Sequence, residues 1–319
     1  MDLSCLNDLD VKIERDTPLS RHTTFKLGGK CPAVIECRDA KILQATVTRL
    51  RDHRIDFLLM GFGSNILASD NGCDKVIVRY TSALPLIQRE ENIITTDAAT
   101  PLDSLAAYAA DAGLDGLTAM FGIPGTAGGA IAGNAGAYGE QISDHLQSVN
   151  VLRKDSSIAT LPTASIPFSY RDSPFKHNGD ILLTASFALT PLTKDALHAK
   201  RDKVLKERKF KLDFWQHYPC AGSFFRNVAP TSNAGQRRAA GWFLEQAGAK
   251  DLCLNGARTY AEHANIITHA DGATAQDVYE LSLKMAALVK AKFDIDLVRE
   301  VRLLGKFKGM AASDPKGYW

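Results

Sequence analysis

Short apolar segments alternate with amphipathic stretches over the N-terminal part of the chain. Apolar runs of strand length are typical of buried strands, and they occupy residues 33–37, 57–60, 76–80, 93–96, 149–153, 157–161 and 181–190. Apolar residues at helical spacing predict two helices, over residues 40–53 and 102–112. The order of these elements predicts two consecutive units of strands and helices, over about residues 1–80 and 81–194.

The pattern changes over residues 195–211, which contain seven cations, three acids and few apolar side chains. Charge runs of this kind usually face water, so the segment predicts a solvated helix that connects two domains. We expect a compact C-terminal domain over residues 212–306 to follow it. Residues 307–319 match no pattern and are expected to form a flexible tail.

Two sequence patterns predict a helix and a strand in the C-terminal domain. Thr274 and Asp277 have the spacing of a capping box, and apolar residues at intervals of three and four predict that the helix they open ends at Phe293. Residues 297–304 predict a strand, whose period of two places Glu300 and Arg302 on one face. An acid and a base therefore share an otherwise apolar strand.

The segment GIPGTAGGAIAGNAGAYG, residues 122–139, contains seven glycines, five alanines and no charged residue. Fixed glycine costs conformational entropy, so such a run usually serves positive φ angles or a close approach of the backbone to a ligand. Pro124, Asn134 and Tyr138 interrupt the run and distinguish it from a disordered tract. Because neither GxxxxGK[ST] nor a helix-opening GxGxxG is present, backbone amides that line a phosphate-rich ligand are the best interpretation.

A second glycine turn, GFGSNIL at residues 61–67, follows an apolar strand. Ligands commonly bind at the carboxyl ends of strands in α/β folds, so this turn is a further candidate binding segment.

Composition narrows the class of partner. With 38 basic and 36 acidic residues, the chain gives no reason to expect nucleic acid or a membrane as its partner. The six cysteines form no CxxC pair and the eight histidines no HExxH, so we expect no metal site and no disulfide framework, and a reducing cytoplasm fits best. Residues 1–20 do not resemble a signal peptide, and no apolar run reaches the length of a membrane span.

Three side chains are candidates for chemistry, each with a structural alternative. Arg171 suits recognition of a carboxylate or phosphate through its planar guanidinium, or else it pairs with Asp172. Ser223 follows a glycine and precedes two phenylalanines, a context that a turn serine also has. Glu300 could act on a ligand or form an ion pair with Arg302. A GxSxG nucleophile elbow is missing, so these residues taken singly indicate a ligand-binding α/β protein and leave its reaction open.

Seven segments taken in order identify a family. RHTTFKLGG (21–29), LLMGFGSNIL (58–67), GIPGTAGGAIAGNAGAYG (122–139), FSYRDSPFK (168–176), AGSFFRNV (221–228), AEHANII (261–267) and EVRLLG (300–305) together resemble the UDP-N-acetylenolpyruvoylglucosamine reductase family. The resemblance covers about residues 15–306 and rests on the combination of motifs. It implies an α+β fold, with a two-subdomain FAD-binding region of the PCMH, or vanillyl-alcohol-oxidase-like, type over residues 1–194. A smaller α+β substrate-binding domain over residues 212–306 would follow.

The resemblance also implies the cofactors and the site residues. FAD would be bound non-covalently, NADPH would be the co-substrate, and a nucleotide sugar with an enolpyruvyl group would be reduced. Separately from the resemblance, we expect a monomer. The matching cofactor positions are Gly61, Gly63, Ser64, Asn65, Gly122, Ile123, Pro124, Gly125, Thr126, Gly128, Gly129, Gly133, Asn134, Gly136, Ala137 and Tyr138.

Catalytic roles follow from the same motifs. By resemblance, Ser223 would donate a proton to the substrate, while Arg171 and Glu300 would stabilise an enol-like intermediate. Glu300 could do so only if its carboxyl is protonated or shares a proton. Tyr170 and Asn227 match positions that contact the substrate.

The chain departs from the family pattern at several points. FRNV replaces the usual FKNP, so Arg226 takes the place of lysine and Val228 that of proline. GFGSN replaces the common GGGSN, so Phe62 would have to point away from the cofactor. The short spacing between Arg171 and Ser223 resembles the form of the family that lacks a tyrosine-bearing substrate loop.

Two other functions fit parts of the sequence. A flavoprotein oxidase of the same FAD-binding fold would account for the glycine segments, but not for Ser223, Glu300 and Arg302 in their context. A non-catalytic nucleotide-sugar-binding protein would be expected to lack the serine or the glutamate, and both are present.

Overall fold

The computed structural model describes residues 1–230, 237–270 and 272–310, apart from the side chains of residues 209–216. The chain forms two compact units, each built from segments that are distant in sequence. The first unit comprises Met1–Arg15, Pro32–Phe62 and Lys75–Leu212, and the second comprises Asp16–Cys31, Gly63–Asp74 and Asp213–Trp319. Compact units and contiguous domains do not coincide in this chain, and the domain boundaries at residues 194 and 306 stay predictions.

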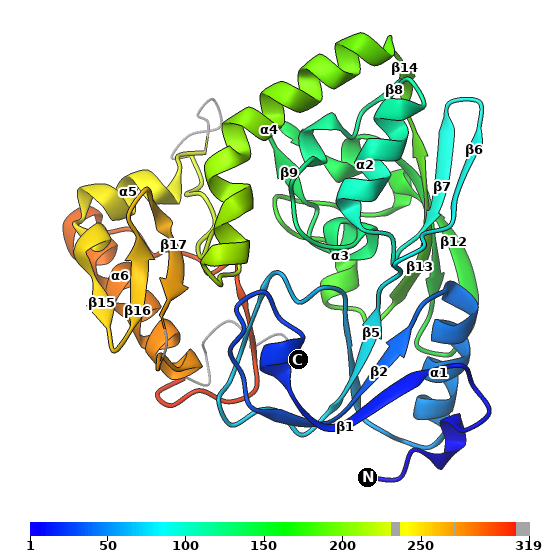
Figure 1. Ribbon diagram of the computed structural model, residues 1–319, viewed down its shortest axis with the longest axis horizontal. Helices are drawn as coiled ribbons and strands as arrows, with labels where there is room; N and C mark the ends of the chain where they lie inside the picture. Colours follow the sequence, from blue (N-terminus) through cyan, green and yellow to red (C-terminus); the bar gives the residue numbers. More distant parts are fainter. Residues whose placement is uncertain (231–236, 271, 311–319) are drawn as a thin grey trace. The chain divides into compact units, whose positions relative to one another are not determined.

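The three predicted strands of the first group join a strand that was not predicted, Lys12–Pro18, in a four-stranded sheet. Its order is β1–β2–β5–β3, with bounds Lys12–Pro18, Lys30–Cys37, Val76–Tyr80 and Phe57–Met60 (Figure 1). β5 pairs in parallel with both β2 and β3. Helix α1, Ala40–Asp52, begins where the Asp39 side chain accepts a hydrogen bond from the Ile42 amide at 2.8 Å. This capped helix buries Leu43, Val47 and Leu50, as its helical spacing predicted.

The four predicted strands of the second group join a strand that was not predicted, Ile87–Glu90, in a five-stranded antiparallel sheet. Its order is β12–β11–β13–β7–β6, with bounds Ile158–Pro162, Leu146–Leu152, Ile181–Ala188, Ile93–Asp97 and Ile87–Glu90. Helices α2 and α3 belong to the same unit and span Leu102–Asp111 and Ala127–Ala132. Two short antiparallel pairs complete it, β8 with β14 (Leu114–Asp115, Thr190–Pro191) and β9 with β10 (Gly136–Ala137, Glu140–Gln141). The predicted helices and strands of the N-terminal region are thus confirmed.

Helix α4, Lys194–His217, confirms the predicted connecting helix and extends beyond it. The pattern led us to expect that the charged residues of this helix face water, but not all of them do. Leu197 is fully buried, and the Arg208 guanidinium donates a hydrogen bond of 2.9 Å to the Ala119 carbonyl. The many charged residues of this segment predicted that Arg208 faces water, and that prediction was wrong, because its guanidinium bonds to a main-chain carbonyl.

The second unit packs two helices with a three-stranded antiparallel sheet. The strands β15, β16 and β17 span Cys253–Leu254, Ala257–Tyr260 and His263–His269. Helix α5 spans Ala240–Gln246 and α6 spans Ala275–Phe293. Thr274 and Asp277 form the predicted capping box at the start of α6, which ends at Phe293 as predicted. Buried α6 residues that include Val278, Leu281 and Met285 join a separate hydrophobic core.

The predicted strand over residues 297–304 is shorter in the structure. Only Arg302–Leu304 forms a strand, β18, which pairs in parallel with β4, Ile66–Ala68. Residues 298–301 instead make single backbone contacts with residues 224–226, so no continuous ladder forms there. The alternation of burial persists, since Val301 and Leu303 are buried while Val298 is exposed.

Phe307, the first residue of the predicted tail, packs in the core of the second unit. Phe307 is buried, and its ring centroid lies 5.1 Å from that of Tyr279. Residues 311–319 lie outside the described residues, so the prediction of flexibility is not tested there.

Candidate active site

The turn GFGSN at residues 61–65 follows β3 directly. Gly63 has φ +65°, and a Cβ atom at this position would lie 2.4 Å from the carbonyl oxygen of His22. A Cβ at Gly61 would lie 2.9 Å from the Thr126 hydroxyl. Both positions therefore need glycine because the backbone approaches its neighbours too closely for any side chain.

The same turn presents amide groups suited to an anionic ligand. Among the described residues, the amides of Phe62 and Gly63 donate to no protein oxygen. Consecutive backbone N–H groups at a turn bind phosphate oxygens readily. The turn is therefore compatible with the diphosphate of a dinucleotide cofactor.

The glycine-rich segment uses most of its own amides for folding. Thr126 caps helix α3 and accepts the Gly129 amide at 3.1 Å. Amides that already donate within the protein are those of Gly122, Ile123, Ala127, Gly128, Gly129, Ala130, Gly133, Asn134 and Ala135. The segment therefore offers fewer donors for a diphosphate than its sequence led us to expect.

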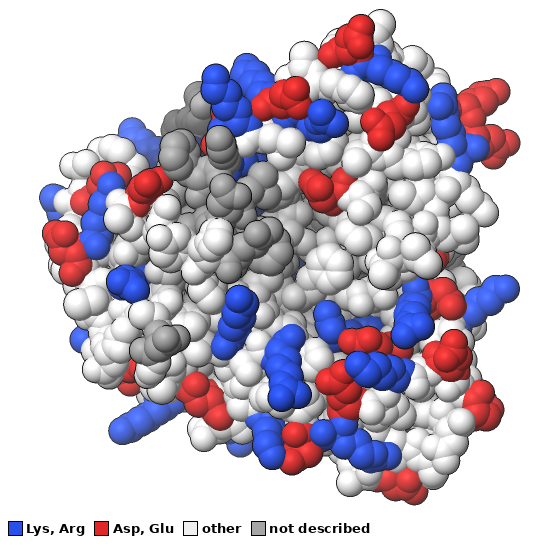
Figure 2. Space-filling model, in the orientation of Figure 1, with Lys and Arg blue, Asp and Glu red and all other residues white. Residues whose placement is uncertain are grey.

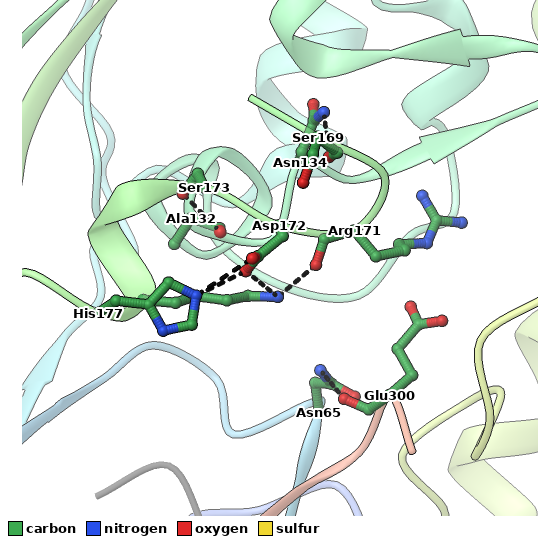
Figure 3. Close-up of polar contacts among 10 residues, drawn as sticks. Asn65, Ala132, Asn134, Ser169, Arg171, Asp172, Ser173, His177 and Glu300 are labelled. Atoms are coloured by element: carbon green, nitrogen blue, oxygen red, sulfur yellow. Dashed lines mark hydrogen bonds and ion pairs between the residues drawn. The ribbon is translucent and has the colours of Figure 1, made fainter. Parts of the chain in front are cut away.

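Asn134 connects the glycine-rich segment to the loop that carries Arg171. Its side chain is buried, and its Nδ2 donates to the Gln141 side chain at 3.0 Å. The same Nδ2 donates to the Ser169 carbonyl at 2.9 Å (Figure 3). The Oδ1 atom is buried and has no hydrogen-bond partner among the described residues. A buried amide oxygen without a donor costs free energy, which a donor from a bound ligand would offset.

Arg171 lies in a tight turn whose other bonds also reach the glycine-rich segment. The amide and carbonyl groups of Ser169 and Asp172 exchange two hydrogen bonds of 3.1 Å, and Arg171 between them has φ +57°. Its guanidinium donates to the Gly136 carbonyl at 2.7 Å, and the Ser173 hydroxyl donates to the Ala132 carbonyl at 2.8 Å. The guanidinium carbon also lies 5.3 Å from the ring centroid of Tyr170, a cation–π contact.

The structure shows two side-chain partners for Asp172 that the sequence did not suggest. The Lys176 ammonium lies 3.8 Å from the Asp172 carboxylate, and His177 Nε2 lies 3.0 Å from it (Figure 3). Sequence reasoning assigned Lys176 and His177 no role. Their spacing of four and five residues after Asp172, across Pro174, was the available signal.

Arg208 of α4 lies beside Tyr138, the last of the predicted cofactor-binding residues, in the first unit. Its guanidinium carbon is 5.2 Å from the ring centroid of Tyr138, and its buried Nε has no partner among the described residues. Burial, more than any neighbouring charge, lowers the pKa of the Arg208 guanidinium.

In the second unit, Ser223 and Glu300 are carried by backbone segments that bond to each other. The Glu300 amide donates to the Phe224 carbonyl at 2.8 Å, directly beside Ser223. Ser223 itself forms a bridge with Ile266 of β17 and is exposed. Asn265 fixes the same segment, because its side-chain amide both accepts from the Phe225 amide and donates to the Phe225 carbonyl. Sequence reasoning assigned no role to Asn265, whose signal was a lone amide in an apolar strand.

Asn65 fixes the position of the segment that carries Glu300. Its Nδ2 donates to the Glu300 carbonyl at 3.1 Å (Figure 3). Its main-chain carbonyl accepts the Arg302 amide at 3.0 Å. A residue predicted for the cofactor thus also orders the predicted catalytic segment.

Asn227 has a structural contact in addition to its predicted role. Its Oδ1 accepts the amide of Ala240, the first residue of α5, at 3.2 Å. The adjacent Arg226, which replaces the family lysine, has a buried Nε without a partner among the described residues.

All six cysteines are free thiols. Within the described ranges, no group of three or more His, Cys, Asp or Glu side chains is placed to hold a metal ion. No helix in the described part of the chain has the length and apolar character needed to span a membrane.

Comparisons with known proteins agree with the motifs. Residues 31–161 match the profile of an FAD binding domain, and residues 214–304 match that of the UDP-N-acetylenolpyruvoylglucosamine reductase C-terminal domain. A reductase of that name from Lactobacillus helveticus is 33% identical over 97% of this chain and 100% of its own. Another from Nostoc punctiforme is 34% identical over 95% of this chain and 90% of its own.

A solved structure extends the likeness to three dimensions. The crystal structure of the UDP-N-acetylenolpyruvylglucosamine reductase from Thermus caldophilus superposes with a TM-score of 0.75 and is 26% identical. The match covers 92% of this chain and all of the other. The identity of 33% to the Lactobacillus helveticus reductase extends over 97% of this chain, and both domain profiles match. The chain therefore belongs to the UDP-N-acetylenolpyruvoylglucosamine reductase family.

Proposed function

We propose that the protein uses NADPH and FAD to reduce UDP-N-acetyl-3-O-(1-carboxyvinyl)-glucosamine to UDP-N-acetylmuramate, a precursor of peptidoglycan. Family membership over nearly the whole chain supports the reaction class. The observation that carries the assignment to this chain is the backbone pairing that fixes Ser223 beside Glu300.

The residues present fit FAD. The turn amides of Phe62 and Gly63 suit its diphosphate, and the orphan Oδ1 of buried Asn134 suits a donor group of the cofactor. When bound, FAD supplies the hydride that NADPH has delivered. The protein contributes orientation of the cofactor, exclusion of competing reactions and control of charge and protons on the substrate.

Ser223 is the proposed proton donor to the carbon next to the substrate carboxylate. Its exposure leaves the hydroxyl accessible to a ligand, while the bonds of Asn265 and Glu300 to Phe224 and Phe225 hold its backbone. A donor held in place needs no reorganisation during proton transfer, which is the usual requirement for general acid catalysis.

Arg171 and Glu300 are the proposed stabilisers of negative charge on the substrate carboxylate. Arg171 offers a planar guanidinium, and its turn fixes the backbone of the residue. The Glu300 backbone is held by hydrogen bonds to Phe224 and Asn65. Loss of one preorganised donor to a developing oxyanion typically costs about 2.7–4 kcal/mol of transition-state stabilisation.

Tyr170 and Asn227 are proposed to contact the nucleotide sugar, and the short spacing between Arg171 and Ser223 supports the shorter family form. On the one face that Figure 2 shows, acidic and basic side chains of the described residues are intermixed, and the sequence as a whole carries 38 basic and 36 acidic residues, a balance that favours a small ligand over nucleic acid. We further propose a cytoplasmic monomer.

The test is reoxidation of the NADPH-reduced enzyme under anaerobic conditions. The proposal requires that the enolpyruvyl nucleotide sugar reoxidise the flavin and form UDP-N-acetylmuramate in equal amount. Reoxidation by oxygen with a simple sugar or alcohol, and none by the enolpyruvyl compound, would instead identify an oxidase. Binding of the nucleotide sugar without any flavin would identify a binding protein.

A further inference from the structure

Lys176 occupies an unusual position for a lysine in this chain. Its side chain is only 8% exposed, and it belongs to the short 3₁₀-helix Pro174–Lys176 that follows the Arg171 turn. Lysine is rarely buried unless its ammonium is paired and hydrogen-bonded. The contacts of this ammonium therefore indicate what the burial serves.

The ammonium bonds to the backbone of the proposed catalytic arginine. Lys176 Nζ donates a hydrogen bond of 2.5 Å to the carbonyl oxygen of Arg171. Its charge is balanced by the carboxylate of Asp172, at 3.8 Å, which His177 also contacts. The ammonium of this largely buried side chain thus makes a short hydrogen bond to the main chain of Arg171.

That main chain has a conformation that arginine rarely adopts. Arg171 has φ +57°, and the third position of the four-residue turn 169–172 normally takes glycine or asparagine when φ is positive. A non-glycine residue persists in this region only where surrounding contacts hold it. The Lys176 bond is one of those contacts.

The direction of the Arg171 side chain depends on that conformation. With the backbone held, the guanidinium reaches the Gly136 carbonyl at 2.7 Å and packs against Tyr170. If Arg171 changed to a negative φ, its Cα–Cβ bond would point in another direction, and the guanidinium would lie away from these partners. Displacement by about 1 Å of a group that binds the reacting molecule can cost on the order of a hundredfold in rate.

We propose that Lys176 is a positioning residue for substrate reduction, which acts by holding the left-handed turn that aims Arg171. The inference rests on the proposed function of Arg171 and assigns Lys176 no contact with the substrate. Asp172 serves it by neutralising the buried ammonium.

The experiment compares Lys176→Met, which keeps the buried chain and removes the donor, with His177→Asn. The second variant removes a partner of Asp172 but leaves the bond between Lys176 and Arg171 in place. Stopped-flow measurement of the reduced holoenzyme should show flavin reoxidation by the enolpyruvyl substrate slowed about ten- to a hundredfold in Lys176→Met. NADPH-driven flavin reduction should stay within about twofold of wild type in both variants, and reoxidation within about threefold in His177→Asn.

A double-mutant cycle separates positioning from a general structural effect. In an Arg171→Ala background, Lys176→Met should change reoxidation by less than about twofold, because the side chain that it positions is gone. Independent, multiplying effects of the two substitutions would overturn the proposal.

Hydrogen exchange gives a readout that does not depend on turnover. The amides of Ser169 and Asp172, which close the turn, should exchange faster in Lys176→Met than in wild type or His177→Asn. If Lys176→Met fails to fold, Lys176→Gln, which keeps an amide donor, is taken through the same measurements with a smaller expected slowing.

The outcomes separate the two proposals. A wild-type enzyme that the enolpyruvyl substrate does not reoxidise contradicts the proposed function, and exchange alone then decides whether Lys176 anchors the turn. A wild-type enzyme that is reoxidised, with a Lys176 variant that matches its rate, overturns the positioning role whatever the exchange shows.

Discussion

The amide of Glu300 donates a hydrogen bond of 2.8 Å to the carbonyl oxygen of Phe224, the residue next to Ser223. The two proposed catalytic residues of the second unit are therefore held by main-chain bonds. Because those bonds do not involve either side chain, substitutions at Ser223 and Glu300 can alter chemistry while the local backbone is preserved. The next predictions use this separation.

The protein should purify yellow, with one non-covalent FAD per chain. Two observations support this expectation. A Cβ atom at Gly61 or Gly63 would clash with neighbouring atoms, and the amides of Phe62 and Gly63 donate to no oxygen of the described residues. Acid or heat denaturation should release the flavin into the supernatant, where its absorbance gives the stoichiometry. A colourless protein that takes up no added FAD would contradict the cofactor assignment.

Ser223→Ala should separate the two half-reactions. The hydroxyl acts after hydride has reached the substrate, so flavin reduction by NADPH should keep its wild-type rate. Reoxidation by the enolpyruvyl substrate should slow by about 10²–10⁴-fold, the usual contribution of a positioned proton donor. Equal slowing of both half-reactions would mark Ser223 as structural.

Glu300→Gln tests the assignment against an ion pair with Arg302. A partly exposed pair contributes about 0–1 kcal/mol, so its loss would barely change turnover. If Glu300 transfers or shares a proton, glutamine keeps the shape but cannot do so, and reoxidation should fall by orders of magnitude. FAD content and NADPH oxidation should persist, because the Glu300 backbone bonds to Phe224 and Asn65 remain.

The contrary result for Glu300 is equally specific. Reoxidation within a few-fold of the wild-type rate would return Glu300 to a structural role. Arg171 and Ser223 would then carry the chemistry.

The capping box of α6 predicts a dependence of stability on pH. Burial raises the pKa of Asp277, but hydrogen bonds from Thr274 and Asn255 outweigh it, and the net pKa lies below the ordinary aspartate value. A lowered folded pKa stabilises the protein above the unfolded pKa of about 3.9, and this contribution is lost as pH falls through the folded pKa. Asp277→Asn should therefore destabilise by about 0.5–2 kcal/mol at neutral pH.

Urea unfolding of Asp277→Asn and wild type at several pH values measures this effect. The difference in free energy of unfolding should be constant above about pH 5 and shrink below about pH 4. Asp251→Asn, the same substitution at an exposed aspartate outside α6, is unfolded in parallel as the matched control. A difference that grows on acidification would reverse the sign and refute the account.

Local signals in the sequence predicted local structure well. The capping box at Thr274 and Asp277 and the apolar spacing of α1 were each read from residues a few positions apart, and both are confirmed. The 297–304 strand was predicted too long because alternation records burial, whereas a ladder also needs a partner strand of matching length.

Long-range pairing had no such signal. The pairing of β4 with β18 places Ile66 opposite Arg302 and Ala68 opposite Leu304, residues that are far apart in the sequence, and no local pattern predicts this pairing. The Arg171 site shows the same limit. The sequence motifs located Arg171. Only the structure shows that Lys176 bonds to its carbonyl and that its backbone is left-handed, because nothing in the composition predicts an arginine at φ +57°.

The division of the second unit among distant segments has a consequence for synthesis on the ribosome. Segments Asp16–Cys31 and Gly63–Asp74 emerge early, yet their partners begin only at Asp213. At 5–20 residues per second, the roughly 140 intervening residues take about 7–28 s to translate. During that interval Phe25 and Leu67, both fully buried in the finished protein, have no core to enter, so nascent chains should recruit chaperones until translation is nearly complete.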